Sequence, residues 1–513
     1  MKLKAKSSFF LLLMCFCFSS NAQNIQEADK LFAGKMYNAA RIAYQKLFDN
    51  DKNNIELNYK IALCYINMPG YKLKAKPYLD FLVKQPTYDK QAMFYLAKIH
   101  QIEHNFDLAI ATYNKFIALA SSKAADKAYR EIETCRNAIV AVRQPVDVII
   151  ENLGKDVNSE NDDFFPYVSA NESILIFSSN RKGTTANIIT PDLQPNTDVF
   201  ACEVKSGKWQ KAKNAGEHVN TMFNEKCSFL SYNGDVLINR LEKSFNDGDL
   251  YYAQIKNKKT KNTPFIAPIN SASIESSAYL KNDSTVIVFS SNRLGGYGGL
   301  DLWMSNRLPT GEWGVPTNLG PTINSRFNED FPYSPDDLKT IFFSSEGYNS
   351  MGGFDIYKSA FDEVSNKWEA PKNIGYPINT PDDNYTICFA GNKKTAYSTY
   401  ARADAIGGLD IYKISYNQVE NNKTLVRGKV VMPIDAKKNI TETIVDVFTK
   451  KNQELFGTYK VQFSGNFFMI LPPGEYILNV DLDGFKAHSE ELEILDKIDF
   501  KENMDKTINL QNK

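Results

Sequence analysis

Between residues 146 and 416 the chain repeats one pattern five times, and this repeat constrains the fold more than any other feature. Each copy begins with a triplet of Val or Ile, then Asn, then Ser or Thr. An apolar run follows, and then an Asp that precedes an apolar and an aromatic residue. Successive triplets are 50 to 62 residues apart. The triplets begin at Val157, Val219, Ile269, Ile323 and Ile378, and the Asp steps at Asp198, Asp249, Asp301, Asp355 and Asp410.

Each repeated unit predicts four short strands separated by Gly, Pro, Asn and Asp, which is too small a unit to bury a core alone. Units of this kind stack around an axis, and closing the ring hides the edges of the sheets. The last unit lacks an outer strand, and a matching segment, Val146–Glu151, stands before the first unit. The sequence therefore predicts a β-propeller over residues 143–420 in which this N-terminal strand completes the last blade. Five blades are expected, and six remain open if Lys182–Thr197 contains a degenerate unit.

Several strings in this repeat resemble a known family. Phe331–Asp337, Phe343–Ser345 and Gly353–Tyr357 are similar to the WD40-like repeat called PD40, which is found in TolB-type propellers. The resemblance covers about half the chain and implies the fold firmly. It implies a function only loosely, because propellers carry unrelated activities.

A second repeat occupies residues 23–142. Small and aromatic residues recur 34 or 35 positions apart, which is the period of a helix pair. The spacing resembles tetratricopeptide (TPR) repeats and predicts a short solenoid of three helix pairs with a capping helix over residues 125–142. Such a solenoid offers a concave groove to a peptide or partner helix; packing on the propeller alone is the alternative. The recurring residues are Ala28, Ala62 and Ala97, then Tyr44, Tyr78 and Tyr113.

Residues 423–513 alternate apolar and polar side chains in the manner of half-buried strands. We expect a seven-stranded β-sandwich there. The stretch Gly465–Tyr476 resembles the carboxypeptidase regulatory-like, or transthyretin-like, domain, which implies a module without catalysis. The expected architecture is thus a helical solenoid, a propeller and a transthyretin-like sandwich in that order.

The composition excludes some partners. Lys and Arg number 60 and Asp and Glu also 60, so the chain has no basic footprint for nucleic acid. Residues 1–22 have the basic start, apolar centre and small residues of a secretory signal, and no later apolar run reaches the length of a membrane span. A lipid anchor at Cys15 is the alternative, disfavoured by the bulky Met14. We expect an exported, periplasmic protein, peripheral to the outer membrane if it is attached at all.

Aligning the repeats places a set of cations just past the second predicted strand. They are candidates for a ligand-binding ring on one propeller face. The competing interpretation is that they pair with the Asp of the third strand and tie a loop down. No cofactor or metal is expected: His100 and His104 fit a zinc-peptidase spacing, but a third ligand is missing. The candidate cations are Arg181, Lys243, Arg293 and Arg402.

Three functions were weighed. The order of the three modules is similar to envelope proteins of Bacteroidota, some of them components of the type IX secretion and gliding apparatus. This chain departs from them by ending at Lys513, without their OmpA-like peptidoglycan-binding domain. The resemblance implies a non-catalytic periplasmic scaffold that docks outer-membrane or secretion components. The alternative is a glycan- or peptide-binding propeller, favoured if aromatic and cationic residues converge at its mouth. A metal-dependent hydrolase is the remote third.

Overall fold

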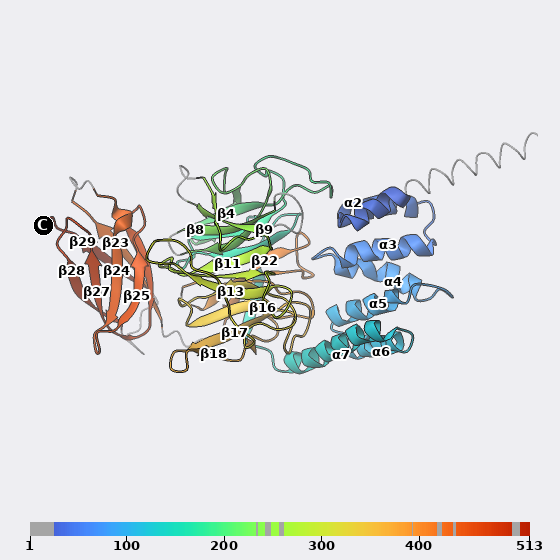
Figure 1. Cartoon of the computed structure of the whole chain (residues 1–513). Helices are drawn as coiled ribbons and strands as arrows, with labels where there is room; N and C mark the ends of the chain where they lie inside the picture. The colour runs from blue at the N-terminus through green and yellow to red at the C-terminus, as the bar shows by residue number, and fades with distance from the viewer. Residues whose placement is uncertain are drawn as a thin grey trace, which may run out of the picture. The chain divides into compact units, whose positions relative to one another are not determined.

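The computed structural model of the protein divides into two compact units, one built from the chain up to residue 143 with residues 187–196, the other from residues 144–186 and 197–513. Helices come first and a large strand-rich region follows (Figure 1), so the predicted order of helical and β structure is confirmed. The predicted signal, residues 1–22, lies outside the described residues. These are 25–231, 234–241, 248–255, 261–391, 393–417, 423–433, 438–494 and 503–513.

The helical unit begins with a helix over residues 25–33. Alanines at the predicted period, Ala28, Ala62 and Ala97, are fully buried, which lets neighbouring helices approach closely. Tyr44 and Tyr113 fill the space beside them. The further helices are α2 (Tyr37–Phe48), α3 (Ile55–Ile66), η1 (Lys72–Ala75), α4 (Lys76–Leu82), α5 (Gln91–Ile102), α6 (Phe106–Ile117) and α7 (Ser122–Arg143).

Two helix N-termini in this unit are capped in different ways. Asn54 caps α3 locally, because its Oδ1 accepts the N–H of Leu57 at 3.0 Å. The N-cap residue of α2, Met36, offers no such side chain. The N–H of Ala39 is instead accepted by Asp192 Oδ1 at 2.9 Å, so the segment 187–196 supplies the missing cap.

Residues 146–417 form five antiparallel sheets in the described part of the chain. In chain order, sheet 1 holds β2 (Asp163–Val168), β3 (Ile174–Ser179), β4 (Asp198–Lys205), β5 (Lys208–Trp209) and β6 (Lys213–Asn214). Sheet 2 holds β7 (Asn224–Leu230), β8 (Asp235–Leu241), β9 (Gly248–Gln254) and β10 (Thr263–Pro264). Sheet 3 holds β11 (Glu275–Leu280), β12 (Val286–Ser291), β13 (Asp301–Asn306) and β14 (Thr317–Asn318). Sheet 4 holds β15 (Glu329–Tyr333), β16 (Thr340–Ser345), β17 (Asp355–Asp362), β18 (Lys367–Trp368) and β19 (Lys372–Asn373). Sheet 5 holds β20 (Ile387–Phe389), β21 (Thr395–Tyr400), β22 (Asp410–Tyr416) and β1 (Val148–Asn152).

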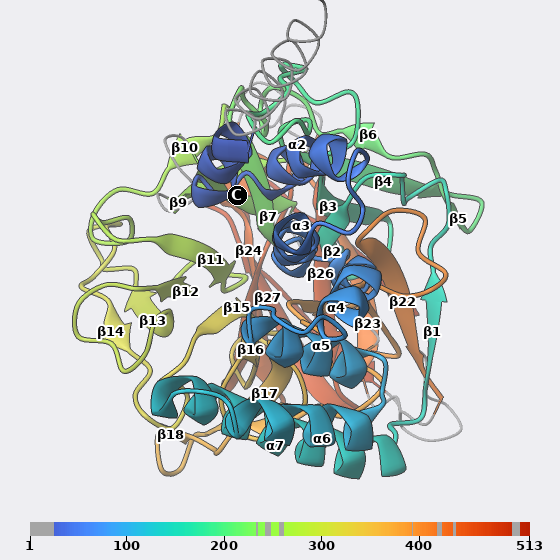
Figure 2. The ribbon, with the colours of Figure 1, turned by 90° about the vertical axis from the view of Figure 1, so that its right-hand side faces the viewer.

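The five sheets contact one another in cyclic order. β2 packs on β7, β11 on the strands of sheets 2 and 4, and β20–β22 return to β2. Tyr333 of sheet 4 donates to the carbonyl of Phe389 in sheet 5 at 3.2 Å. The first strands β2, β7, β11 and β15 lie near the middle of the ring and β1, β5, β14 and β18 at its rim (Figure 2). This is the arrangement of a β-propeller.

The ring is tied at one point by segments far apart in the sequence. β1 pairs with β22 in antiparallel register, Val148 opposite Tyr416 and Asn152 opposite Tyr412. This pairing supplies the outer strand of sheet 5 and joins both ends of the propeller segment. Sheet 5 also contacts sheet 1, so the cycle of contacts between the sheets is closed.

The C-terminal strands form two further sheets around a separate core in the described residues. Phe467 and Leu478, one from each sheet, are fully buried in that core. β23 and β29 run parallel, while the other neighbouring pairs are antiparallel. The order is β26–β23–β29 in one sheet and β25–β24–β27–β28 in the other. The elements are β23 (Thr424–Val431), η2 (Ile440–Glu442), β24 (Ile444–Thr449), β25 (Leu455–Lys460), β26 (Asn466–Leu471), β27 (Gly474–Asp481), β28 (His488–Ile494) and β29 (Asn503–Asn509).

Candidate functional site

The Asn of every repeated triplet joins one sheet to the next. Its Oδ1 accepts the N–H, and its Nδ2 donates to the carbonyl, of a single residue in the third strand of the preceding sheet. All ten distances lie between 2.8 and 3.0 Å, so the amide side chain continues the ladder of the sheet; we call each pair an Asn latch. The pairs are Asn158 with Ile411, Asn220 with Val199, Asn270 with Leu250, Asn324 with Leu302 and Asn379 with Ile356.

The repeated Asp at the start of the third strand has an equally fixed role in four sheets. One carboxylate oxygen accepts a loop backbone N–H and also the Nδ2 of an Asn in the outermost strand, at 2.5 to 2.9 Å. These carboxylates are buried, so the donors are needed to satisfy them. The pairs are Asp198 with Asn214, Asp301 with Asn318, Asp355 with Asn373 and Asp410 with Asn152.

The predicted cations Arg181 and Arg293 belong to the same structural network. Arg181 pairs with Asp163 and Arg293 with Glu275, the latter at 2.9 Å, and both acids are fully buried. Each guanidinium also donates to a carbonyl of the preceding triplet, Val157 or Ile269. The partner is therefore the acid that opens the first strand, whereas the repeated third-strand Asp residues just described are held by backbone and Asn donors.

The other aligned positions behave differently. In sheet 2 the corresponding ion pair is made by Arg240, whose Nε lies 2.9 Å from Glu225; burial raises the pKa of Glu225 to about 7 although this cation and Thr221 oppose the rise. Lys243 lies outside the described residues. Arg402 is half-exposed, with its Nε 3.8 Å from Asp404. Of the three predicted cations that the structure describes, Arg181 and Arg293 are bound to buried acids and Arg402 is not, so these three do not form one ligand-binding set.

In sheets 4 and 5 a tyrosine hydroxyl, and not a guanidinium, donates to the carbonyl of the triplet. Tyr348 donates to the carbonyl of Ile323, and Tyr400 to that of Ile378 at 3.0 Å. The acid of sheet 4, Glu329, is fully buried and accepts from Ser325 and Ser345. Burial raises the pKa of Glu329, and these hydroxyls oppose the rise. In sheet 5 the acid is replaced by Asn384.

The residue that follows this acid differs in chemistry in every sheet. Four of the five are half-buried although their neighbours on both sides in the first strand are mostly buried, so their side chains border open space. A position that varies among otherwise matching repeats takes no part in the contacts that repeat around the ring and is a natural place for ligand chemistry. These five, called the mouth residues, are Phe164, Lys226, Ser276, Asp330 and Tyr385.

Aromatic rings from three sheets meet at the axis beside the mouth residues. Phe165 of sheet 1 lies 4.6 Å from Phe331 of sheet 4, between ring centroids, although these sheets are not neighbours. Tyr385 of sheet 5 lies 5.9 and 5.8 Å from the two rings. Both Phe residues sit at β-bulges with φ of 55° and 54°, a backbone conformation that bulky residues rarely adopt. Strain of this kind is kept where the surrounding structure fixes a functional geometry.

Two mouth residues, Lys226 and Ser276, line a cavity of about 590 Å³, with Asn239, Asn292 and Asn328 around them. Burial lowers the pKa of Lys226, and the Asp330 carboxylate opposes the drop. Within the described chain no carboxylate lies within 4.0 Å of the Lys226 ammonium. Asp330 itself accepts from Ser276 Oγ at 2.7 Å, which links two mouth residues.

Sequence reasoning missed the mouth residues because it looked for what repeats. The signal was the opposite one, a position directly after the repeated acid whose residue differs in every unit. The two histidines with a zinc-peptidase spacing lie in the helical unit. His100 lies buried in α5 and His104 in the turn after it, with φ of 62°. The described residues contain no group of three His, Cys, Asp or Glu side chains placed to hold a metal ion. Among the same residues, no helix is long and apolar enough to cross a membrane.

No family model matches this chain, and no curated protein matches it by sequence. Solved structures do match it at low similarity. A glycoside hydrolase is 10% identical over 55% of this chain and 95% of its own, with a TM-score of 0.37. A prolyl endopeptidase is 11% identical over 65% of this chain and 39% of its own, with a TM-score of 0.25. A 3-chlorocatechol 1,2-dioxygenase from Rhodococcus opacus is 13% identical over 19% of this chain, with a TM-score of 0.15; this chain spans 62% of its length.

One expectation is corrected by these comparisons. The sequence analysis expected a protein without enzymatic activity, and that expectation is wrong as stated, because the matching structures include several glycoside hydrolases and prolyl peptidases. The physical reason is that a ring of small sheets is a frame on which loops and mouth residues can support either binding or catalysis. The likeness itself assigns neither an activity nor a substrate to this chain.

Proposed function

We propose that the protein binds a glycan or peptide segment at the mouth of its propeller. The observation that carries this proposal is the chemistry at the position after the repeated acid, where two sheets place aromatic rings beside the Phe165–Phe331 pair and two others place an ammonium and a hydroxyl in the wall of a cavity. Aromatic faces stack on sugar rings and on apolar side chains, while the ammonium of Lys226 and the hydroxyl of Ser276 orient polar groups.

The network described above supports the proposal because it fixes the rim of the mouth. Each Asn latch holds the loop that leads into a first strand, and each third-strand Asp holds the loop before that strand. The mouth residues follow the loops that the Asn latches hold directly in the chain. Their backbone is therefore positioned before a ligand arrives, which reduces the entropy that binding costs.

We also propose the finer architecture. The five sheets are the blades of a complete five-bladed PD40 propeller, the helical unit is a TPR solenoid, and residues 423–513 are a regulatory-like sandwich. The cyclic order in which the sheets contact one another and the buried alanines of the helical repeat support this assignment. It would place the chain with the envelope proteins of Bacteroidota that it resembles, exported to the periplasm by residues 1–22. In that setting the helical groove would dock an outer-membrane or secretion partner.

The test is a binding screen carried out with matched variants. The wild-type protein and the double variant K226A/Y385A are applied to a glycan array and to a peptide library. K413A serves as the control, because Lys413 is a half-buried lysine of β22 away from the mouth. The proposal predicts a ligand that wild type and K413A retain and that the double variant loses. Equal retention by all three proteins, or no ligand from either library, would refute it.

A further inference from the structure

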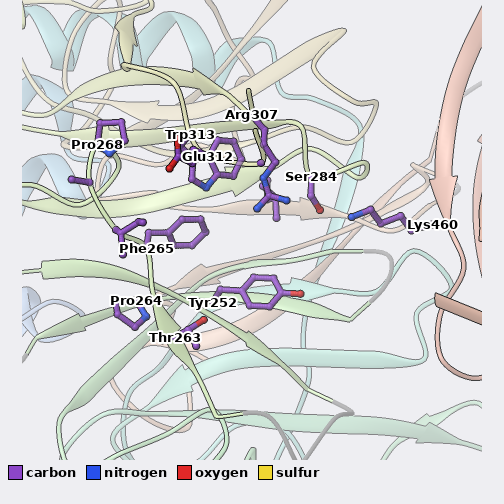
Figure 3. Close-up of a pocket in the computed structure, with 14 residues that line it drawn as sticks. Tyr252, Thr263, Pro264, Phe265, Pro268, Ser284, Arg307, Glu312, Trp313 and Lys460 are labelled. Carbon is purple, nitrogen blue, oxygen red and sulfur yellow. The ribbon is translucent and has the colours of Figure 1, made fainter. Parts of the chain in front are cut away.

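A second cavity, of about 580 Å³, lies at the outer strands of two neighbouring sheets (Figure 3). We call it the side cavity. One wall comes from β9, β10 and the segment after them, which contribute Tyr252 and Phe265. The opposite wall comes from the loop between β13 and β14, which contributes Arg307 and Trp313. None of these four residues is a mouth residue, and Lys460 of β25 also borders the space.

The loop that carries Arg307 and Trp313 is tightly folded. The two residues face each other in an antiparallel bridge, so their side chains share one side of the hairpin. Leu308 N–H donates to the carbonyl of Glu312 at 2.7 Å, and Gly311 closes the turn with φ of 87°, where glycine fits without strain. The two side chains are thus held in place before any ligand binds.

The same tryptophan recurs in two other sheets, where it has a different neighbour. Trp209 is paired with Val204 and lies 6.2 Å from the ring of Tyr397, and Trp368 is paired with Phe361, whose ring is 5.1 Å away. These two pack against apolar partners. Trp313 differs, because its cross-strand partner is a cation: the Arg307 guanidinium lies 5.0 Å from the ring centroid.

Besides Arg307 and Lys460, the side cavity is lined by aromatic rings and by the polar side chains of Thr263, Ser284 and Glu312. The ring of Phe265 lies 6.3 Å from that of Trp313 at a tilt of 47°, and Tyr252 closes the wall beside it. Figure 3 shows the three rings and the Arg307 guanidinium around the same space. Flat aromatic faces suit the apolar face of a sugar ring, and a planar guanidinium binds a carboxylate through two parallel hydrogen bonds.

We propose that the side cavity is a second, independent binding site, for an acidic saccharide. Its sugar rings stack on Trp313 and Phe265, and a uronate carboxylate binds Arg307. The volume lies within the range of small-ligand pockets, which is about 300–1,000 Å³. A neutral saccharide stacks on the same rings but leaves the guanidinium without its partner, so the site discriminates by charge.

The test uses tri-galacturonate as the probe and the neutral trisaccharide of galactose as its matched control. Binding to the full-length protein is followed by tryptophan fluorescence and by calorimetry. Wild type should bind tri-galacturonate at least about tenfold more tightly than the neutral sugar. R307A should lose that preference, and W313A should lose binding of both sugars. W368F and K413A should bind as wild type does.

R307A keeps the test decisive, because Arg307 is exposed and its removal leaves the fold intact. W313A is interpreted only if its thermal unfolding matches wild type. The proposal is overturned if R307A retains the preference for the charged sugar, if neither sugar binds, or if poly-glutamate competes as well as tri-galacturonate. The last result would mean that charge alone is recognised and that the aromatic rings do not read a sugar.

Discussion

Removing one Asn latch tests whether the repeated triplet holds the propeller together. The variant is N324A. In the native protein Asn324 is 2% exposed; its Oδ1 accepts the N–H of Leu302 at 2.8 Å, and its Nδ2 donates to the Leu302 carbonyl at 3.0 Å and to Asn318 Oδ1 at 2.8 Å. Truncation to Ala removes all three hydrogen bonds at once.

The loss of unfolding free energy depends on which backbone groups keep a hydrogen-bond partner in the variant. The Leu302 carbonyl still accepts the N–H of Leu319 at 3.0 Å, so it stays satisfied. The Leu302 N–H is left without its acceptor in a fully buried place, at about 1–3 kcal/mol, and the two lost side-chain hydrogen bonds add about 0.5–1.5 kcal/mol each. The free energy of unfolding should therefore fall by about 3 kcal/mol.

The assay is urea unfolding followed by tryptophan fluorescence, because all four tryptophans lie within residues 146–417 and Trp303 follows Leu302 directly. N306A is the matched control, an exposed Asn at the end of the same strand, and should stay within about 0.5 kcal/mol of wild type. The denaturant slope should not change. The reasoning fails if N324A unfolds at the same urea concentration as N306A.

Three further predictions follow from single contacts. D192A should speed hydrogen exchange of the first-turn amides of α2 about fivefold, since a lost N-cap costs about 1 kcal/mol; unchanged exchange at Ala39 would contradict the cap. Burial raises the pKa of Glu329 above its ordinary 4.5, so the folded protein binds this proton more tightly than the unfolded chain does, and the resulting stability is present below about pH 4.5 and lost as the pH rises. E329Q should therefore gain stability over wild type as the pH is raised from about 5 to 7.5. E275Q should instead lose about 3 kcal/mol, because it leaves the Arg293 guanidinium without its carboxylate. The urea midpoints of both variants are measured at both pH values, and an equal response of the two would contradict this difference. G428A should lower the thermal midpoint of the C-terminal sheets, because a Cβ there would lie 1.9 Å from the buried ring of Phe467, and a normal midpoint would show that the ring can move aside.

The two periods in the sequence were enough to predict the order of helical and strand-rich regions. Ala28, Ala62 and Ala97 recur at a helix-pair spacing, and the triplets recur at the spacing of a small sheet, so each period reports what its residues must bury. The apolar run in each unit then predicts strands such as β3 and β12, whose apolar side chains are mostly buried.

The site was harder to predict because a repeated residue and a functional residue look alike in one sequence. Arg181 and Arg293 were selected as aligned cations, yet each is bound to an acid 18 positions earlier, Asp163 or Glu275, that repeats with it. Which acid an arginine pairs with depends on the register between the strands, and a local sequence pattern does not specify that register. Lys226 and Tyr385 could be recognised only as departures from the repeat.

The central claim is that repeated residues hold the ring while the mouth residues bind the ligand. The most direct measurement is hydrogen exchange of the full-length protein with and without the ligand selected in the screen. Protection should appear in the peptides that contain Phe164, Lys226, Ser276 and Tyr385, and the helices α2–α7 should be unchanged. Protection confined to those helices or to residues 423–513, with the first strands of the five sheets unaffected, would contradict the account.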